Sequence, residues 1–486
     1  MLADDSSSTR KYNEITGLQL FAMTTSMVMT VYGFAPFAQQ GPTAIFFLFL
    51  AGILWFIPVT QASGEMASIE GWEKGGIFTW TKNMLGERTG WAAMFYQWVH
   101  ITVGLDSMMY FIIGCVSMMF KAPYLNTNML VRFGLMMVII WGIILLQRHG
   151  AKVSGTISQW CFMLGIVLPV ALLLVLFVTY LAQGNPTYIH LSWHTIIPHS
   201  FGGSVWVGFV PFILAFCGAE GSAPHVKDLK NPGVYPKVMF ALALSAILSD
   251  VIGSMSIAMT IPRAKIQTST GIVYTYGHLI HALGVNGTVV GLFEWLIALL
   301  LAVGVIGEIS SWVIGPNDAM FEAAKAGFLP ARYAKPNKYG VPTKIMYLQG
   351  AIVTLTAVLM TFLGGGSADM AFDMAMASTV AQYTLMYMIM FVAYMVLLLK
   401  HKDLKREYTV SKSTTLKMIM AILGFALSAL GFVVTFIPTT GLSHSARVTY
   451  FMLLLITSLI VFVLPFILYR HHAKWKKDVD ALNLED

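Results

Sequence analysis

The sequence predicts an all-α polytopic membrane protein with twelve transmembrane helices, and three observations support this prediction. Of the 486 residues, 57% are hydrophobic and only 11% are charged, whereas soluble domains carry about 25% charged residues. A chain with so few charges cannot cover a globular surface with polar groups, so a lipid bilayer is its natural solvent. The third observation is the series of long apolar segments that occupies nearly the whole chain.

Twelve of these segments are long enough to cross the hydrocarbon core of a bilayer, which takes about 20 helical residues. The connections between them are short, so we expect no soluble domain. The predicted spans are residues 15–39, 42–66, 90–119, 129–147, 153–182, 203–224, 234–260, 289–324, 343–363, 371–400, 414–437 and 447–470.

The basic residues predict the orientation of the spans. The two tails and the loops that follow even-numbered spans contain 25 of the 30 lysines and arginines, and the other loops contain five. Basic residues gather on the cytoplasmic side of a membrane. Both the tail at residues 1–14 and the short tail at 471–486 are therefore expected in the cytoplasm. This distribution explains the net charge of +7, so we expect no nucleic-acid partner.

The sixth span is interrupted by residues that weaken a helix. The run "FCGAEGSAP" at 216–224 places Gly218, Glu220 and Gly221 inside an apolar segment. Unwinding frees backbone N–H and C=O groups that hydrocarbon cannot satisfy, so such a break must line a polar cavity. The ends of two half-helices carry partial charges that suit the carboxylate and the ammonium of a zwitterion. We expect a binding site here, beside Glu220; alternatively, Glu220 only accepts hydrogen bonds from the loosened backbone.

The first span shows a weaker signal of the same kind. The stretch "TTSMVMTVYGFAPF" at 24–37 contains Gly33 and Pro36, and the proline weakens helical hydrogen bonding. Five spans precede the sixth, and a unit of five spans that repeats must be inverted in the membrane. Helices broken at equivalent places in inverted repeats mark the binding site of a secondary transporter. This predicts a first repeat at 15–182, a second repeat at 203–400 and two further helices within 414–470.

Three longer stretches resemble a known superfamily. They are "GEMASIEGWEKGGIFTW", "GAEGSAPHVKDLKNPGVYP" and "GEISSWVIGPNDAMFEAAKAGFLP", and they resemble the amino acid–polyamine–organocation (APC) superfamily, in particular its bacterial glutamate/GABA antiporter family. The resemblance covers essentially the whole chain and implies a five-plus-five inverted repeat with broken helices one and six. It also implies exchange of an external amino acid for its internal decarboxylation product, which consumes protons inside the cell and supports acid resistance.

The resemblance also implies most of the substrate-binding residues. Backbone contacts are expected from the two broken helices, and side chains are expected from helices one, eight and ten. Their aromatic rings would close over a small zwitterion or stack on a cation. Together with Asp106, the predicted set is Ser26, Met29, Thr30, Tyr32, Gly33, Asp106, Cys217, Gly218, Glu220, Gly221, Glu308, Trp312, Tyr383 and Tyr387.

Asp106 departs from the family, which carries an apolar residue there. A charged group at membrane depth costs at least about 2.5 kcal/mol, so we expect Asp106 to face the cavity. No lysine or arginine is expected inside the spans to pair with it, which leaves a cation of the substrate as its partner. The alternative is a protonated or solvated aspartate with a packing role.

Two glutamates are candidates for sensing protons. Glu308 lies deep in the eighth span, where desolvation disfavours the charged form of a carboxyl group, and Glu220 lies beside the expected cavity. The alternative for Glu308 is a hydrogen-bonded structural carboxyl. We also expect packing or structural roles for His100 and for Glu65, which lies near a helix end.

The function predicted from these observations is secondary antiport without covalent chemistry. A glutamate/GABA pair follows from the resemblance, and an amino acid with its biogenic amine, such as histidine/histamine or tyrosine/tyramine, follows from Asp106. The expected partners are the amino acid, its amine product, the bilayer and a cytoplasmic decarboxylase. We expect no cofactor and no metal: His190, His194 and His199 share one loop, but we favour solvated histidines there.

Overall fold

A computed structural model describes residues 15–72, 75–149, 160–200, 202, 205–206, 208–363, 367–438 and 443–482. Within these ranges the protein is helical and has no strand, only two isolated bridges, Ile15 with Leu229 and Ile69 with Arg406. Its α-helices are α2 (Gly17–Val28), α3 (Phe34–Ala38), α4 (Thr43–Phe49), α5 (Ile57–Ala67), α6 (Gly76–Leu85), α7 (Glu87–Met119), α8 (Tyr124–Thr127), α9 (Met129–Gln147), α11 (Leu168–Ala182), α12 (Trp193–Ile196), α14 (Val210–Ala215), α15 (Tyr235–Thr260), α16 (Gly271–Ala282), α17 (Gly287–Lys325), α18 (Thr343–Val358), α19 (Ala368–Lys400), α20 (Thr414–Thr435), α21 (His444–Tyr469) and α22 (His472–Asp480).

Shorter helical segments of other types extend or connect these helices. Among the described residues, three π-helical segments continue α-helices inside the long apolar rods, three 3₁₀ segments lie in the connections, and a fourth, η3, follows α14. The π-helical segments are η1 (Leu50–Phe56), η2 (Met163–Val167) and η7 (Leu359–Leu363); the 3₁₀ segments are η3 (Ala219–Val226), η4 (Pro232–Val234), η5 (Arg263–Lys265) and η6 (Ala331–Ala334).

Ten of the described helices are long and apolar enough to cross a membrane. Nine of them coincide with spans predicted from the sequence, within a few residues at either end. The tenth, Trp160–Ala182, ends where the predicted span 153–182 ends, and residues 153–159 of that span lie outside the described residues. The remaining two predicted spans, 15–39 and 203–224, are the two in which the sequence predicts a break. The structure divides them into shorter helical pieces, α2 with α3 and α14 with η3.

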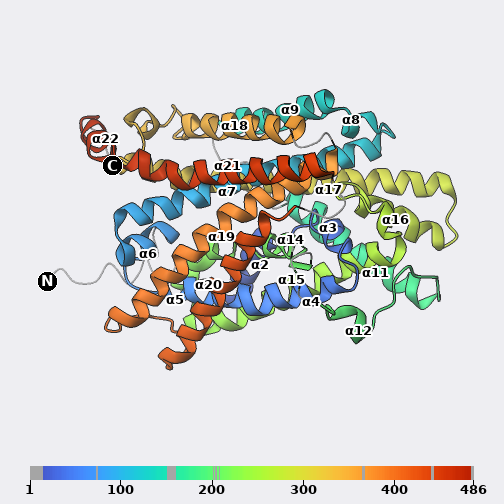
Figure 1. The fold of residues 1–486 in the computed structure, drawn as a ribbon, viewed down its shortest axis with the longest axis horizontal. Helices are drawn as coiled ribbons and strands as arrows, with labels where there is room; N and C mark the ends of the chain where they lie inside the picture. Colours follow the sequence, from blue (N-terminus) through green and yellow to red (C-terminus); the bar gives the residue numbers. More distant parts are fainter. Residues whose placement is uncertain are drawn as a thin grey trace.

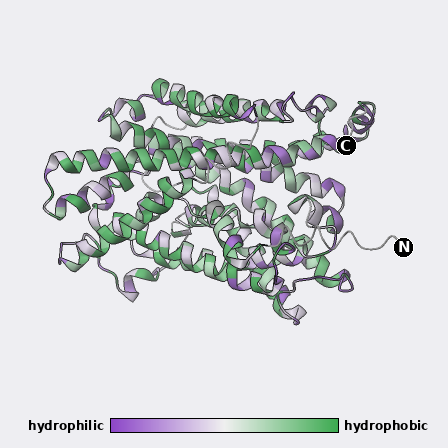
Figure 2. Cartoon of the chain, turned by 180° about the vertical axis from the view of Figure 1, so that it is seen from behind, coloured by the Kyte–Doolittle hydropathy of each residue, from purple (hydrophilic) through white to green (hydrophobic). Residues whose placement is uncertain are grey.

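Helix α7 lies at the centre of the bundle. It packs most extensively against α19 and α17, and most of its residues are buried. Helix α21, by contrast, is largely exposed, and Figure 1 shows it along the outside of α7 and α19. Seen from behind in Figure 2, the long helices are mostly hydrophobic and the hydrophilic colours concentrate in the connections at the ends. This is the surface expected of a bundle surrounded by lipid.

The described connections gather at two opposite ends of the bundle. One end carries α6 and α22, and the other carries α8, α12 and α16 (Figure 1). Hydrogen bonds join connections at the first end, for example His472 Nδ1 with the Gly327 carbonyl at 3.0 Å. Others join connections at the second end, for example Asn126 Nδ2 to Ser269 Oγ at 3.2 Å.

At the end that carries α6, a buried ion cluster fixes α5 to the connection between α19 and α20. The Glu65 carboxylate is fully buried. It accepts hydrogen bonds from the Arg406 guanidinium, from Lys417 Nζ at 2.7 Å and from the Tyr394 hydroxyl at 2.8 Å. The Val410 N–H donates a further bond at 3.1 Å. These contacts fit the structural role that the sequence predicts for Glu65.

Two glycines permit one close helix contact. Gly165 of η2 lies against Gly304 of α17, and a Cβ atom added at Gly165 would stand 2.3 Å from the Gly304 Cα. Small residues allow backbones to approach closely in membrane bundles, where packing rather than hydrophobicity holds helices together.

Candidate functional site

The first predicted span is interrupted between Met29 and Gly33. Helix α2 ends at Val28, Met29 is extended with φ −74° and ψ 115°, and α3 begins at Phe34. Pro36 lies in the first turn of α3, where its missing N–H costs no helical hydrogen bond. The sequence therefore ends one helix and starts another within the buried part of the protein.

The sixth predicted span is interrupted at Phe216–Gly218. Helix α14 ends at Ala215, and after the break the chain continues as the 3₁₀ segment η3. Gly218 has φ +105°, a left-handed conformation that costs other residues about 1–2 kcal/mol. The glycine at this position is thus the residue that the backbone of the break requires.

The two breaks border a small cavity of about 50 Å³. Helix α7 supplies much of the remaining wall, and α17 and α19 complete it. The lining residues are Val28, Thr30, Tyr32, His100, Ile101, Gly104, Leu105, Ser107, Met108, Leu214, Cys217, Gly218, Trp312, Thr379 and Tyr383. Because ligand pockets usually measure about 300 Å³ or more, side chains must move before an amino acid can enter.

Glu220 ties three segments together beside this cavity. Its carboxylate is 4% exposed and accepts hydrogen bonds from the hydroxyls of Tyr383 and Tyr387, each at 2.5 Å, and from Gln97 Nε2 at 3.2 Å. Buried polar groups are normally satisfied in this way. The three donors come from α19 and α7, so Glu220 connects η3 to both helices. All three donors are side chains, whereas the alternative considered for Glu220 was hydrogen bonds from the loosened backbone.

Glu308 and Trp312 lie one turn apart on α17, and therefore on the same face. Trp312 lines the cavity. Glu308 is 6% exposed, and neither oxygen has a hydrogen-bond partner in the described part of the chain. A buried carboxyl without partners is costly in its charged form, which makes it a candidate for proton exchange.

Asp106 is not brought to the cavity. It is completely buried between α7 and α18, where it accepts a hydrogen bond of 2.5 Å from the Thr356 hydroxyl. The expectation that the spans contain no basic side chain is wrong. Lys417 lies in α20, and the fully buried Arg132 of α9 lies 5.6 Å from the centre of the Tyr110 ring, one turn beyond Asp106.

The other predicted site residues lie in the two breaks, in η3 or beside Glu220. Met29 and Gly33 belong to the first break, Gly221 lies in η3, and none of the three is among the cavity-lining residues. Tyr387 supports Glu220 from behind Tyr383, with ring centres 4.5 Å apart. The Ser26 side chain lies outside the described part of the structure.

Gln97 and His100 are the site residues that the sequence reasoning missed or set aside. The sequence-based prediction includes no role for Gln97 and only a packing role for His100. Both are polar residues, three positions apart in a largely apolar helix, and polar residues within membrane spans are functional candidates. That signal could have identified them.

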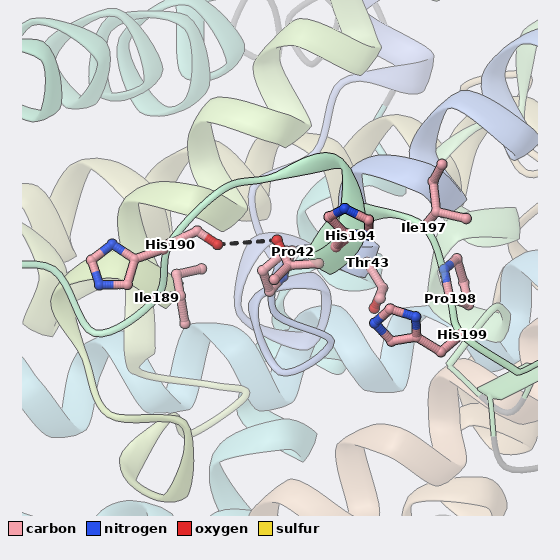
Figure 3. A pocket seen from close by; sticks show the side chains of 9 residues that line it. Pro42, Thr43, Ile189, His190, His194, Ile197, Pro198 and His199 are labelled. Atoms are coloured by element: carbon pink, nitrogen blue, oxygen red, sulfur yellow. Dashed lines mark hydrogen bonds between the residues drawn. The ribbon is translucent and has the colours of Figure 1, made fainter.

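The loop histidines line a separate hollow at the end of the bundle that carries α12. His190, His194 and His199, with Pro42 and Thr43, border a volume of about 380 Å³. Figure 3 shows the three imidazole rings pointing in different directions, and the described residues contain no cluster suited to a metal ion. A hydrogen bond of 3.1 Å from the Thr195 hydroxyl to the His190 carbonyl holds the loop together.

Comparison with known proteins identifies relatives over nearly the whole chain. The family model for amino acid permeases matches residues 15–460. Glutamate/gamma-aminobutyrate antiporters of two Lactococcus lactis strains, from subspecies lactis and cremoris, are each 41% identical over 93% of this chain and 90% of their own length. An uncharacterized transporter of Legionella pneumophila is 28% identical over 90% of this chain and 92% of its own length.

These matches confirm the resemblance inferred from the sequence and the prediction of a transporter rather than an enzyme. The family model and the 41% identical relatives each cover nearly the entire chain, and the residues that the family model matches include both breaks. The chain belongs to the amino acid permease family of the APC superfamily.

Proposed function

We propose that this protein is a secondary antiporter that exchanges external glutamate for internal γ-aminobutyrate (GABA). The observation that carries the proposal is the cavity between the two helix breaks, which is lined by residues of both breaks and by the aromatic side chains of Tyr32, Trp312 and Tyr383. Partial charges at helix ends bind the carboxylate and ammonium groups of a zwitterion without burying a full protein charge. The 41% identical relatives carry the glutamate/GABA name.

The proposed architecture has twelve spans in two inverted repeats, at residues 15–182 and 203–400, followed by two helices within 414–470. The positions of the breaks support this arrangement, because each falls in the first helix of a repeat. The distribution of basic residues supports a cytoplasmic location for both termini in the cytoplasmic membrane.

The proposed residue roles follow the geometry. Side chains that line the cavity contact the substrate, and backbone groups at the breaks bind its charged ends. Glu220 and Tyr387 hold the cavity-lining residue Tyr383 in position. The direct contacts are proposed for Thr30, Tyr32, Cys217, Gly218, Trp312 and Tyr383, and the supporting or backbone roles for Ser26, Met29, Gly33, Glu220, Gly221 and Tyr387. A cytoplasmic decarboxylase would supply the GABA and consume one proton for each glutamate, and the exchange would carry the product out and favour acid resistance.

The alternative substrates, histidine/histamine and tyrosine/tyramine, depended on a cavity-facing Asp106. Since Asp106 contacts Thr356 outside the cavity lining, no structural observation favours a cationic product, and glutamate/GABA remains the single proposal.

Exchange in liposomes tests the proposal. Purified protein should take up labelled glutamate into vesicles loaded with GABA and take up little into empty vesicles. Equal uptake into loaded and empty vesicles would contradict obligatory exchange. Exchange of histidine or tyrosine, but not of glutamate, would replace the proposed substrate pair.

Replacing Glu308 with glutamine should flatten the dependence of exchange on pH. The wild-type carboxyl binds a proton as the pH falls, whereas the amide is neutral at every pH, so the variant should keep the low-pH form of this group throughout. Exchange rates measured across a pH series, with equal pH on both sides of the vesicle membrane, check this result. Glu294→Gln on the same helix is the control, and a wild-type pH profile in the Glu308 variant would remove Glu308 as the sensor.

A further inference from the structure

His100 occupies a distinctive position in the cavity wall. It lies near the middle of α7, it is 5% exposed, and it belongs to the cavity lining. Its imidazole stacks on the Tyr383 ring with centres 3.7 Å apart and an interplanar angle of 21°. Through the Tyr383 hydroxyl, this stacked pair is continuous with the Glu220 carboxylate.

The Nδ1 atom of His100 is completely buried and has no hydrogen-bond partner in the described part of the chain. A buried polar group without a partner costs about 1–3 kcal/mol. The imidazole therefore retains unused hydrogen-bonding capacity at the edge of the cavity.

The other polar side chains that α7 and α19 contribute to the cavity are already engaged. The Ser107 hydroxyl donates to the Gly104 carbonyl at 2.8 Å, the Thr379 hydroxyl donates to the Ala375 carbonyl at 2.9 Å, and the Tyr383 hydroxyl donates to Glu220. On this part of the wall, His100 is thus the side chain that can form a new hydrogen bond without breaking an existing one.

Glutamate and GABA have two features in common, an ammonium group and a carboxyl group at the far end of a three-carbon chain. They differ in the α-carboxylate, which decarboxylation removes. The helix ends at the breaks suit the charges at the α-carbon, so the distal carboxyl needs a partner elsewhere in the wall. An imidazole nitrogen accepts a hydrogen bond from a protonated carboxyl, and an imidazole N–H donates one to a carboxylate.

We propose that His100 is a specificity-determining residue that contacts the distal carboxyl group of the substrate. This inference rests on the proposed glutamate/GABA exchange and adds to it the residue that recognises the group common to both substrates. Amino acids with an apolar distal end, such as norvaline, leave the imidazole unsatisfied and bind less well, because discrimination by an unpaired buried polar group is strong.

Competition with labelled glutamate in GABA-loaded vesicles tests the proposal. The competitors are glutamate, GABA and norvaline, in which a methyl group replaces the distal carboxyl. For the wild type, the half-inhibitory concentration of norvaline should be at least about tenfold above that of glutamate, which corresponds to about 1.4 kcal/mol. His100→Phe keeps the stacking on Tyr383 and removes both nitrogens. It should raise the values for glutamate and GABA by about tenfold and change the value for norvaline less than about twofold.

Two further variants separate contact with the substrate from a packing role. His100→Gln places an amide near the position of Nε2 and should retain the glutamate value within about threefold. His278→Phe removes a histidine that contacts Tyr180 outside the cavity, with ring centres 5.8 Å apart, and should leave all three values unchanged. An equal rise for the three competitors in His100→Phe would show a packing role and overturn the proposal.

The outcomes distinguish this proposal from the proposed function. Wild-type protein that exchanges neither glutamate nor GABA would refute the exchange itself. Wild-type exchange with unchanged competition in His100→Phe would refute only the role of His100. If His100→Phe is not recovered as a monodisperse protein, protection of His100 in the wild type from diethyl pyrocarbonate provides the second measurement. Glutamate should protect the ring and norvaline should not; equal protection by the two would overturn the proposal.

Discussion

Replacing Glu65 with alanine is expected to lower the free energy of unfolding by about 3–5 kcal/mol, because removing one partner of a buried ion cluster leaves uncompensated charges. The Arg406 and Lys417 side chains are 9% and 8% exposed, so water cannot replace the lost carboxylate without rearrangement. The Tyr394 hydroxyl and the Val410 N–H also lose their acceptor. The measurement is the midpoint of thermal unfolding in detergent, which should fall clearly below that of the wild type.

The matched control is Glu322→Ala. Glu322 pairs with Lys325 at 2.7 Å, which is also the distance between Glu65 and Lys417. The side chains of Glu322 and Lys325 are both well exposed. Exposed pairs contribute about 0–1 kcal/mol, so the control should unfold near the wild-type temperature. A triple variant, Glu65→Leu with Arg406→Met and Lys417→Met, should recover much of the loss, because apolar groups can replace a complete buried ion cluster. Equal losses in the two alanine variants would contradict a special role for the buried cluster.

Replacing Gly304 with valine should prevent α17 from packing against η2. A Cβ atom at Gly304 would stand 2.7 Å from the Gly165 carbonyl carbon, and backbone atoms cannot rotate away as a side chain can. Overpacking usually costs about 1–3 kcal/mol and occasionally more, and a contact with backbone belongs to the upper part of this range. The expected result is a lower yield of monodisperse protein and a lower temperature of unfolding.

Gly142→Val is the control for this substitution. Gly142 also lies in a membrane-spanning helix, α9, but a Cβ atom there would meet nothing within 4 Å. Both variants have the same intrinsic cost of placing valine in a helix, so the difference between them isolates the contact between the helices. Similar behaviour of the two proteins would show that the backbones at Gly165 and Gly304 can separate at little cost.

The sequence predicts the break in the sixth span well, because the signal is local. Gly218 is unfavourable inside a helix, and the left-handed conformation that the structure shows there is one that glycine tolerates best. The break in the first span gives a weaker signal, since Pro36 lies in a first helical turn and Gly33 keeps a right-handed conformation. Apolar length alone predicts the ten long helices, because lipid requires about 20 apolar residues in each.

The sequence does not predict which residues of α7 border the cavity. A helix that is exposed on one side reveals its buried face through amphipathic spacing, but α7 is buried nearly all round. His100 and Asp106 therefore give the same signal in the sequence, a polar residue at membrane depth. Only the packing of α18 beside Asp106 and of Tyr383 beside His100 separates them. Likewise, the pairing of Glu65 with Arg406 joins residues 341 positions apart and has no local trace.

Helix α17 has a consequence for how the two ends of the protein move. Its 39 residues give a rod about 58 Å long at 1.5 Å per residue, nearly twice the roughly 30 Å thickness of the hydrocarbon core. The rod contacts α16 near one of its ends and η6 near the other. A tilt about the glycine contact in its middle would therefore displace α16 and η6 in opposite directions.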